Sequence, residues 1–136
     1  MKMRQFDMKK KILTNDMTIY QNLFLAINFL NITTKEKNTR IEEISKKVHL
    51  EEFKDEKINT LSGGEQQRVA LARTILKPSD IILADEPTGS LDSTAAEIAF
   101  NLIKDLSKQY RKTVMMVTHS KNLANQADRI INILEC

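Results

Sequence analysis

Apolar positions in the first half of the chain recur at the spacing of a helix. Leu23, Ile27 and Leu30 are separated by three or four residues, which places their side chains on one helical face. A Thr-x-x-Gln capping box begins at Thr18, just ahead of this pattern. The pattern predicts a helix over residues 19–31.

A second amphipathic helix is expected to open near Thr39. Glu42 lies three residues further on, as in a capping box. The charged side chains opposite the apolar stripe have a simple interpretation as a solvent-facing surface. Residues 55–60 are expected to form a polar connection. The apolar stripe of this helix consists of Ile41, Ile44 and Val48.

After residue 60 the pattern changes to short apolar runs separated by helical segments. Residues 81–84 and 113–118 are continuous apolar or β-branched runs, which predict strands buried on both faces. Between these runs, apolar residues within 95–109 recur at helical spacing, and a capping box is expected at Thr94. A final strand is expected over residues 129–134. Strands that alternate with helices indicate an α/β fold with a parallel sheet.

The run Ser62-Gly63-Gly64-Glu65 opens a third helical segment in the sequence. Ser62 and Glu65 fit a capping box. The two glycines leave room for an anion to approach the free backbone N–H groups of a helix amino terminus. Taken alone, the same run also fits a tight turn with an ordinary cap.

Two carboxylates and a histidine follow predicted strands. Asp85 and Glu86 end the apolar run 81–84, where buried carboxylates need a cation or a proton-transfer task. Asp85 suits a magnesium ion held through water, and Glu86 suits a base for attack on a phosphoryl group. His119 follows the next strand, at the sheet edge where ligands bind. The alternatives are a turn capped by acids and a loop histidine with no catalytic role.

The order and spacing of these segments resemble the catalytic half of an ATP-binding cassette (ABC) ATPase. The likeness covers about residues 58–134, with weaker helical likeness back to residue 17. The runs L-S-G-G-E-Q-Q-R-V-A-L-A-R and A-D-E-P-T-G-S-L-D are most similar to transporter cassettes for lipoprotein release, macrolide export and bacteriocin export.

The resemblance implies a fold and a set of residue roles. It implies an incomplete P-loop NTPase (RecA-like) parallel sheet core with an α-helical subdomain. The division would be a poorly ordered segment 1–16, a helical subdomain 17–76 that includes the signature motif, and a partial core 77–136. The implied cofactors are ATP and Mg²⁺. By this resemblance, Asp85 would bind the metal, and Glu86 and His119 would act in catalysis. The residues implied in ATP binding are those of the signature motif and one residue of the D-loop: Ser62, Gly63, Gly64, Glu65 and Asp92.

The sequence departs from the family pattern in its phosphate-binding loop. None of its three glycines lies in a G-x-x-x-x-G-K-[ST] run, the Walker A motif. We therefore expect this chain alone not to hydrolyse ATP, and we expect exposed sheet edges that are prone to association. The family's Q-loop glutamine is not assigned, because Gln5 lies too far upstream and Lys9 stands nearer its expected place.

The resemblance implies a fragment of the ATP-binding subunit of a bacterial ABC transporter that couples ATP hydrolysis to export. Its partners would be a transmembrane permease subunit and a second ABC ATPase paired head to tail. Its location would be the cytoplasm, at the inner face of the membrane through the permease. Two alternatives are a catalytically silent module that supplies its signature motif in trans, and an inert product of a decayed gene.

Composition narrows the partners further. The net charge is +3 and seven residues are aromatic, without the dense basic face typical of nucleic-acid binders, so no nucleic-acid partner is expected. The longest apolar stretch, residues 23–30, is interrupted by Asn28 and is too short to span a bilayer. Any role in transport would therefore depend on a membrane partner.

Overall fold

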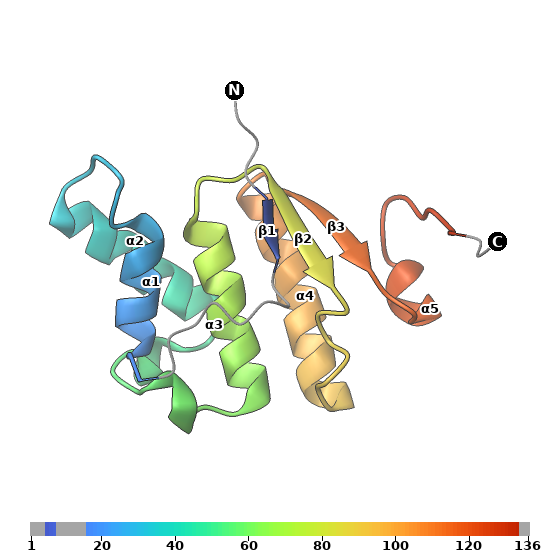
Figure 1. Cartoon of the computed structure of the whole chain (residues 1–136), viewed down its shortest axis with the longest axis horizontal. Helices are drawn as coiled ribbons and strands as arrows, with labels where there is room; N and C mark the ends of the chain where they lie inside the picture. The colour runs from blue at the N-terminus through green and yellow to red at the C-terminus, as the bar shows by residue number, and fades with distance from the viewer. Residues whose placement is uncertain (1–4, 8–15, 134–136) are drawn as a thin grey trace.

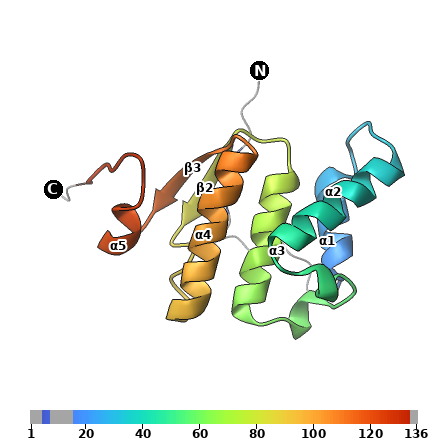
Figure 2. The same cartoon turned by 180° about the vertical axis from the view of Figure 1, so that it is seen from behind.

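The computed structural model describes residues 5–7 and 16–133. Its strands form one parallel sheet in the order β1 (Gln5–Asp7), β2 (Ile81–Asp85) and β3 (Thr113–Val117). Helices α3 and α4 lie against one face of this sheet, and α1 and α2 pack on the far side of α3 (Figures 1 and 2). The predicted α/β class with a parallel sheet is confirmed.

Helix α1 (Ile19–Ile27) begins where the sequence predicts. The Thr18 hydroxyl accepts the Gln21 N–H, and the Gln21 side chain accepts the Thr18 N–H. The predicted end at residue 31 is wrong, because the helix stops at Ile27. The Lys37 ammonium donates to the Asn28 carbonyl over 2.8 Å, which satisfies a carbonyl at the helix end.

Helix α2 (Thr34–Lys47) begins earlier than the predicted start near Thr39. Thr33 is its N-cap and accepts the Glu36 N–H over 3.1 Å. The hydroxyl of Thr39 instead donates to the Lys35 carbonyl inside the helix. Two Thr-x-x-Glu runs follow one another here, at residues 33–36 and 39–42. The upstream run caps the helix, because a cap at Thr33 lets the helix include more than one additional turn.

The predicted polar connection 55–60 also contributes to the core. It contains the short helix η2 (Ile58–Thr60), which follows η1 (Glu51–Phe53). The side chain of Ile58 is fully buried, and an isolated bridge pairs Thr18 with Lys57. Through Ile58 and this bridge, the segment packs against the helical part of the molecule.

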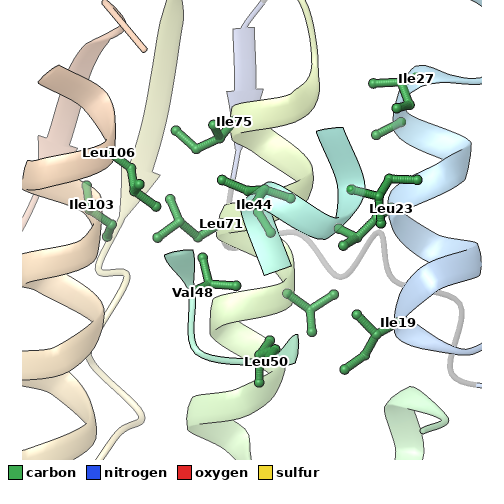
Figure 3. Packing of buried hydrophobic residues seen from close by; sticks show 14 of the residues in the cluster. Ile19, Leu23, Ile27, Ile44, Val48, Leu50, Leu71, Ile75, Ile103 and Leu106 are labelled. Carbon is green, nitrogen blue, oxygen red and sulfur yellow. The ribbon is translucent and has the colours of Figure 1, made fainter. Parts of the chain in front are cut away.

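Helix α3 (Gly63–Leu76) is the centre of the hydrophobic core. It contacts α1, α2 and α4, so a single cluster of buried side chains joins the helical part to the sheet (Figure 3). The fully enclosed members are aliphatic and contribute roughly 1.5–3 kcal/mol each through burial. They include Ile19, Leu23, Ile44, Leu71 and Ile82.

Helix α4 (Ser93–Gln109) ends as predicted but begins earlier than residue 95. Its N-cap is Asp92, whose carboxylate accepts the Ala95 N–H over 2.8 Å. The predicted capping box at Thr94 is therefore wrong. Aspartate ranks above threonine as an N-cap, and the cap at Asp92 lets the helix begin earlier.

The two predicted core strands end near their expected positions, but β3 is not buried on both faces. Its residues alternate between exposed and half-buried, and Met115 is 60% exposed. Figures 1 and 2 show that α3 and α4 cover only one face of the sheet. The prediction of a doubly buried strand is therefore wrong for β3 within the part of the chain that the structure describes.

Both ends of the chain differ from the sequence prediction. Residues 5–7, where no regular element was expected, form β1 beside β2; the rest of the segment 1–15 lies outside the described residues. After the short helix α5 (Lys121–Ala124), residues 129–133 form no strand, and residue 134 is not described. The apolar side chains in this segment are exposed: Ile130, Ile131 and Ile133.

Candidate functional site

The candidate residues gather at the edge of the sheet where β2 and β3 end. Asp85 is the last residue of β2 and is in register with Val117, the last residue of β3. Glu86 follows with a φ of 46°, which places a non-glycine residue in the left-handed region. Its backbone N–H donates to the Val117 carbonyl over 2.8 Å. The end of β3 therefore fixes the direction in which the chain leaves β2.

Glu86 and His119 meet through a backbone group. The His119 N–H donates to Glu86 Oε1 over 2.6 Å. The imidazole Nε2 lies 3.9 Å from the same oxygen, and the histidine side chain is 98% exposed. An exposed pair at this distance contributes little, so the amide is the main contact between the two predicted catalytic residues.

The predicted ATP-binding residues line one open pocket of about 470 Å³. The amino termini of α3 and α4 both border it, which concentrates free N–H groups and the positive ends of two helix dipoles. The cap predicted at Ser62 is confirmed: its hydroxyl accepts the Glu65 N–H, and the Glu65 carboxylate accepts the Ser62 N–H. The pocket is lined by Ser62–Glu65, Arg68, Ser90–Asp92, Thr94, Ala95 and Ile98.

The two glycines of this pocket face different surroundings. A Cβ at Gly64 would lie 3.2 Å from the Cβ of Ala95 on α4, which is closer than side chains usually pack. A Cβ at Gly63 would lie 3.8 Å from the Leu91 side chain, an ordinary contact. Gly64 therefore has a packing role, the close approach of α3 and α4, in addition to the predicted access for an anion.

Arg68 lines the same pocket and was not singled out from the sequence. Its Nε is buried and has no hydrogen-bond partner among the described residues. Arg68 lies four residues after Gly64, on the same face of α3, and this spacing is a signal that the sequence offered. A guanidinium beside two helix amino termini gives the pocket a cationic group suited to phosphate oxygens.

Asp85 is the predicted magnesium ligand. Among the described residues, no group of three or more histidine, cysteine or acidic side chains is close enough to hold a metal ion. Magnesium at phosphoryl-transfer sites is usually held by only one or two protein carboxylates together with water and phosphate oxygens. The chemistry of a single carboxylate at the end of β2 fits that arrangement.

The Q-loop glutamine stays unassigned. Gln5 pairs with Ile81 at the beginning of β2, at the opposite end of that strand from Asp85. At roughly 3.3 Å per residue, this register places Gln5 far from the candidate site. Lys9 lies outside the described residues.

Comparison with known proteins gives consistent matches. The model of the ABC transporter family matches residues 3–89. The lipoprotein-releasing system ATP-binding protein LolD of Desulfotalea psychrophila is 38% identical over 120 residues, 88% of this chain and 54% of that protein. The macrolide export ATP-binding/permease protein MacB of Mannheimia succiniciproducens is 40% identical over 121 residues, 89% of this chain and 19% of that protein.

A solved structure also matches. It is a dimeric, post-hydrolysis state of the ATP-binding cassette MJ0796 bound to ADP and Pi, with a TM-score of 0.74 and 37% identity, covering 90% of this chain and 55% of that one. The chain thus spans about half the length of LolD and of this cassette, and less of MacB. In the described residues, no helix is long and apolar enough to cross a membrane.

Proposed function

Because this chain belongs to the ABC transporter family, whose model matches well over half of it, we propose that it acts in the ATP-binding subunit of a bacterial exporter. We assign residues 17–76 to a helical subdomain and 77–136 to part of the nucleotide-binding core. The relatives support the direction of transport, since one is a lipoprotein-releasing protein and another a macrolide exporter.

The pocket at the amino termini of α3 and α4 is the observation that carries this proposal. We assign Ser62, Gly63 and Gly64 to contacts with the terminal phosphate of an ATP held by a second cassette. Two helix amino termini and the Arg68 guanidinium suit an anion there. Asp92, the cap of α4, is exposed and also lines this pocket, and we assign it to contact with the second subunit. The dimeric state of the matched cassette supports this pairing.

We assign Asp85 and Glu86 to the chemistry at this chain's own nucleotide site, at the edge of the sheet where β2 and β3 end. Asp85 would hold Mg²⁺, which neutralises charge on the transferred phosphoryl group. Glu86 would orient and deprotonate the attacking water, with His119 beside it. Both assignments are supported by the position of these residues, where the parallel strands β2 and β3 end.

These 136 residues contain no G-x-x-x-x-G-K-[ST] run. We therefore propose that the groups that bind the β- and γ-phosphates are supplied by residues outside these 136. Phosphoryl transfer depends almost wholly on positioning and electrostatic stabilisation. Removal of a single preorganised donor already costs about 2.7–4 kcal/mol of transition-state stabilisation. The 136-residue polypeptide alone is therefore expected to show no steady ATP hydrolysis.

The proposed partners are a second ABC ATPase and a membrane permease, through which the chain would lie at the inner face of the cell membrane. A catalytically silent module is the second candidate function. It is favoured by the same pocket, because the signature residues are grouped around it while no Walker A run occurs among the 136 residues. Such a module would complete the ATP site of an intact cassette and receive no working site in return.

Association with an intact cassette tests the proposal. The 136-residue chain is mixed with a full-length LolD-type cassette, and complex formation is measured with Mg²⁺ and ATP or with EDTA. We expect association that requires ATP. A Gly63→Asp variant, which adds a carboxylate to the pocket, should lose it. The matched Asn101→Asp variant, which adds a carboxylate at an exposed residue of α4 outside the pocket lining, should keep it.

Three results are distinguishable. Association that stimulates the partner's hydrolysis supports an active subunit, and association without stimulation supports the silent module. Absence of ATP-dependent association in both the parent chain and Asn101→Asp would contradict the role in trans. Micromolar ATP affinity of the 136-residue chain alone, measured by titration calorimetry, would contradict the assignment of the phosphate-binding groups to residues outside it.

A further inference from the structure

Glu86 is held at two points, by the last residue of β3 and by the turn that follows it. Its backbone N–H donates to the Val117 carbonyl, and its Oε1 accepts the His119 N–H over 2.6 Å. Both contacts are made by main-chain atoms of β3 and the turn after it. The position of the carboxylate is therefore set by the conformation of this turn, and the imidazole of His119 is directed into solvent.

The turn itself is fixed by two hydroxyl groups. Thr118 Oγ1 accepts the Ser120 N–H over 3.0 Å, which closes a side-chain turn around His119. Ser120 Oγ in turn accepts the Leu123 N–H over 3.3 Å and caps α5. The sequence Thr118-His119-Ser120 thus links the first turn of α5 to the amide that faces Glu86.

The loop after Glu86 lies on the other side of its carboxylate. The Gly89 N–H donates to the Glu86 carbonyl over 3.1 Å. A Cβ at Gly89 would lie 3.8 Å from Glu86 Oε2, so the backbone of Gly89 borders the second carboxylate oxygen. Glu86 thus lies between its own loop and the amide of His119, with 26% of its side chain exposed.

We propose that Thr118 is a positioning residue that holds the Glu86 carboxylate on the backbone amide of His119. We call this arrangement, with Oε1 bound to the amide, the stored position of the carboxylate. The Thr118 hydroxyl fixes the turn, the turn directs the amide, and the amide binds the carboxylate. Movement of the 118–120 turn would break this hydrogen bond and release Oε1 as an acceptor for a proton from water. The inference rests on the proposed role of Glu86 as the base.

Amide exchange and chemical shifts of the whole 136-residue chain, followed by NMR without nucleotide, test this directly. The His119 amide proton should be shifted downfield and slow to exchange. Glu86→Ala should move that resonance upfield and speed its exchange about tenfold, since a hydrogen bond to a charged group is lost. Thr118→Val, which keeps the side-chain shape but removes the acceptor, should speed exchange at both His119 and Ser120.

Two matched variants separate the backbone contact from other roles. Thr118→Ser keeps the hydroxyl and should leave both amides protected. His119→Ala keeps the backbone N–H and should leave the residue-119 amide downfield and protected. Loss of the signal in His119→Ala, or its persistence in Glu86→Ala, would overturn the proposal. These two variants leave the Thr118 hydroxyl in place, so they decide only the contact between the residue-119 amide and Glu86. If Thr118→Val does not fold, Thr118→Ala removes the same acceptor and should likewise speed exchange at His119 and Ser120. Unchanged protection of both amides in a folded Thr118 variant that lacks the hydroxyl would overturn the role of Thr118.

The result is independent of the proposed function. No nucleotide or partner cassette takes part in the exchange measurement, so its failure would leave the association experiment unaffected. Equally, failure of ATP-dependent association would contradict the role of the α3/α4 pocket in trans, while the stored position of the Glu86 carboxylate would still be observed or refuted by NMR.

Discussion

The ammonium group of Lys112 lies 2.5 Å from the carbonyl oxygen of Ser79 and 2.9 Å from that of Lys77. It joins the loop before β3 to the loop after α3, at the edge of the sheet where β2 and β3 begin. Lys77 is the C-cap of α3, so the lysine also satisfies a carbonyl at a helix end. Burial lowers the pKa of Lys112 below 10.5, and the carboxylate of Asp80 opposes this shift.

The lowered pKa of Lys112 predicts a pH dependence of stability. Between the folded-state pKa and 10.5, the unfolded chain binds more protons at this site than the folded chain. The free energy of unfolding of the parent chain, relative to Lys112→Met, should therefore rise as pH increases through this window and fall as pH decreases. Urea denaturation of both chains from neutral pH to about pH 10 measures the difference.

Lys104 provides the matched control, because it is an exposed lysine on α4. The difference in unfolding free energy between the parent chain and Lys104→Met should change less over the same pH range. A Lys112→Met difference that stays constant, or that falls with increasing pH, would contradict a buried ammonium at this position.

A side chain at Gly64 should separate the amino termini of α3 and α4. The 3.2 Å approach of a Cβ to Ala95 requires a helix to move, and overpacking of this kind costs about 1–3 kcal/mol. The higher helix propensity of alanine returns up to about 1 kcal/mol. This gain applies to both glycines and cancels between the two variants, so we expect Gly64→Ala to be less stable than Gly63→Ala by about 1–3 kcal/mol, measured by chemical denaturation.

The double variant Gly64→Ala/Ala95→Gly identifies the cause. Removal of the Ala95 methyl group should recover part of the stability lost in Gly64→Ala, giving a favourable coupling energy in a double-mutant cycle. Equal stability of Gly63→Ala and Gly64→Ala would show that the helices adjust without strain. Additive effects of the two substitutions would show that Gly64 and Ala95 do not interact.

The capping box at the start of α3 predicts a difference between two conservative changes. Ser62→Ala removes the acceptor for the Glu65 N–H and should lower the free energy of unfolding by about 1 kcal/mol. Glu65→Gln retains an oxygen that can accept the Ser62 N–H and should lower it by less. Thermal denaturation ranks the three chains; equal stability of the parent and Ser62→Ala would contradict the cap.

These caps show what local sequence decides. Ser62 and Thr18 were predicted as caps and are caps, because each stands alone before its apolar pattern. At Thr39 and Thr94 a better or earlier cap competes, and the observed caps are Thr33 and Asp92. The parallel direction of β2 and β3 also followed from the alternation of predicted strands and helices. The end of α4 followed from its apolar periodicity.

The remaining features depend on contacts between distant segments. The approach of Gly64 to Ala95 joins positions 31 residues apart, and the amide of His119 reaches Glu86 across 33 residues. Periodicity carries no information about such contacts. The continuous apolar run of β3 also predicted burial on both faces of the strand. The observed burial differs because it depends on which helices cover the sheet.

The left-handed backbone of Glu86 predicts an unusual order of stability. At a φ of 46° a non-glycine residue costs about 1–2 kcal/mol, and glycine avoids this cost. Glu86→Gly should therefore be more stable than Glu86→Ala by about 1 kcal/mol. At Lys104, inside α4, the order of the same two substitutions should be reversed by about 1 kcal/mol. Chemical denaturation checks both pairs, and the same order at both positions would contradict strain at Glu86.

The exposed face of β3 predicts self-association of the 136-residue chain. Met115 and Val117 are 60% and 55% exposed on the sheet face that α3 and α4 leave open, and an edge strand with apolar side chains is a site for pairing. Met115→Lys should lower association measured by sedimentation at increasing concentration. Leu25→Lys, which makes the same change at an exposed apolar residue of α1, should leave it largely unchanged. A parent chain that stays monomeric at all concentrations, or equal effects of the two substitutions, would show that the β3 face does not drive association.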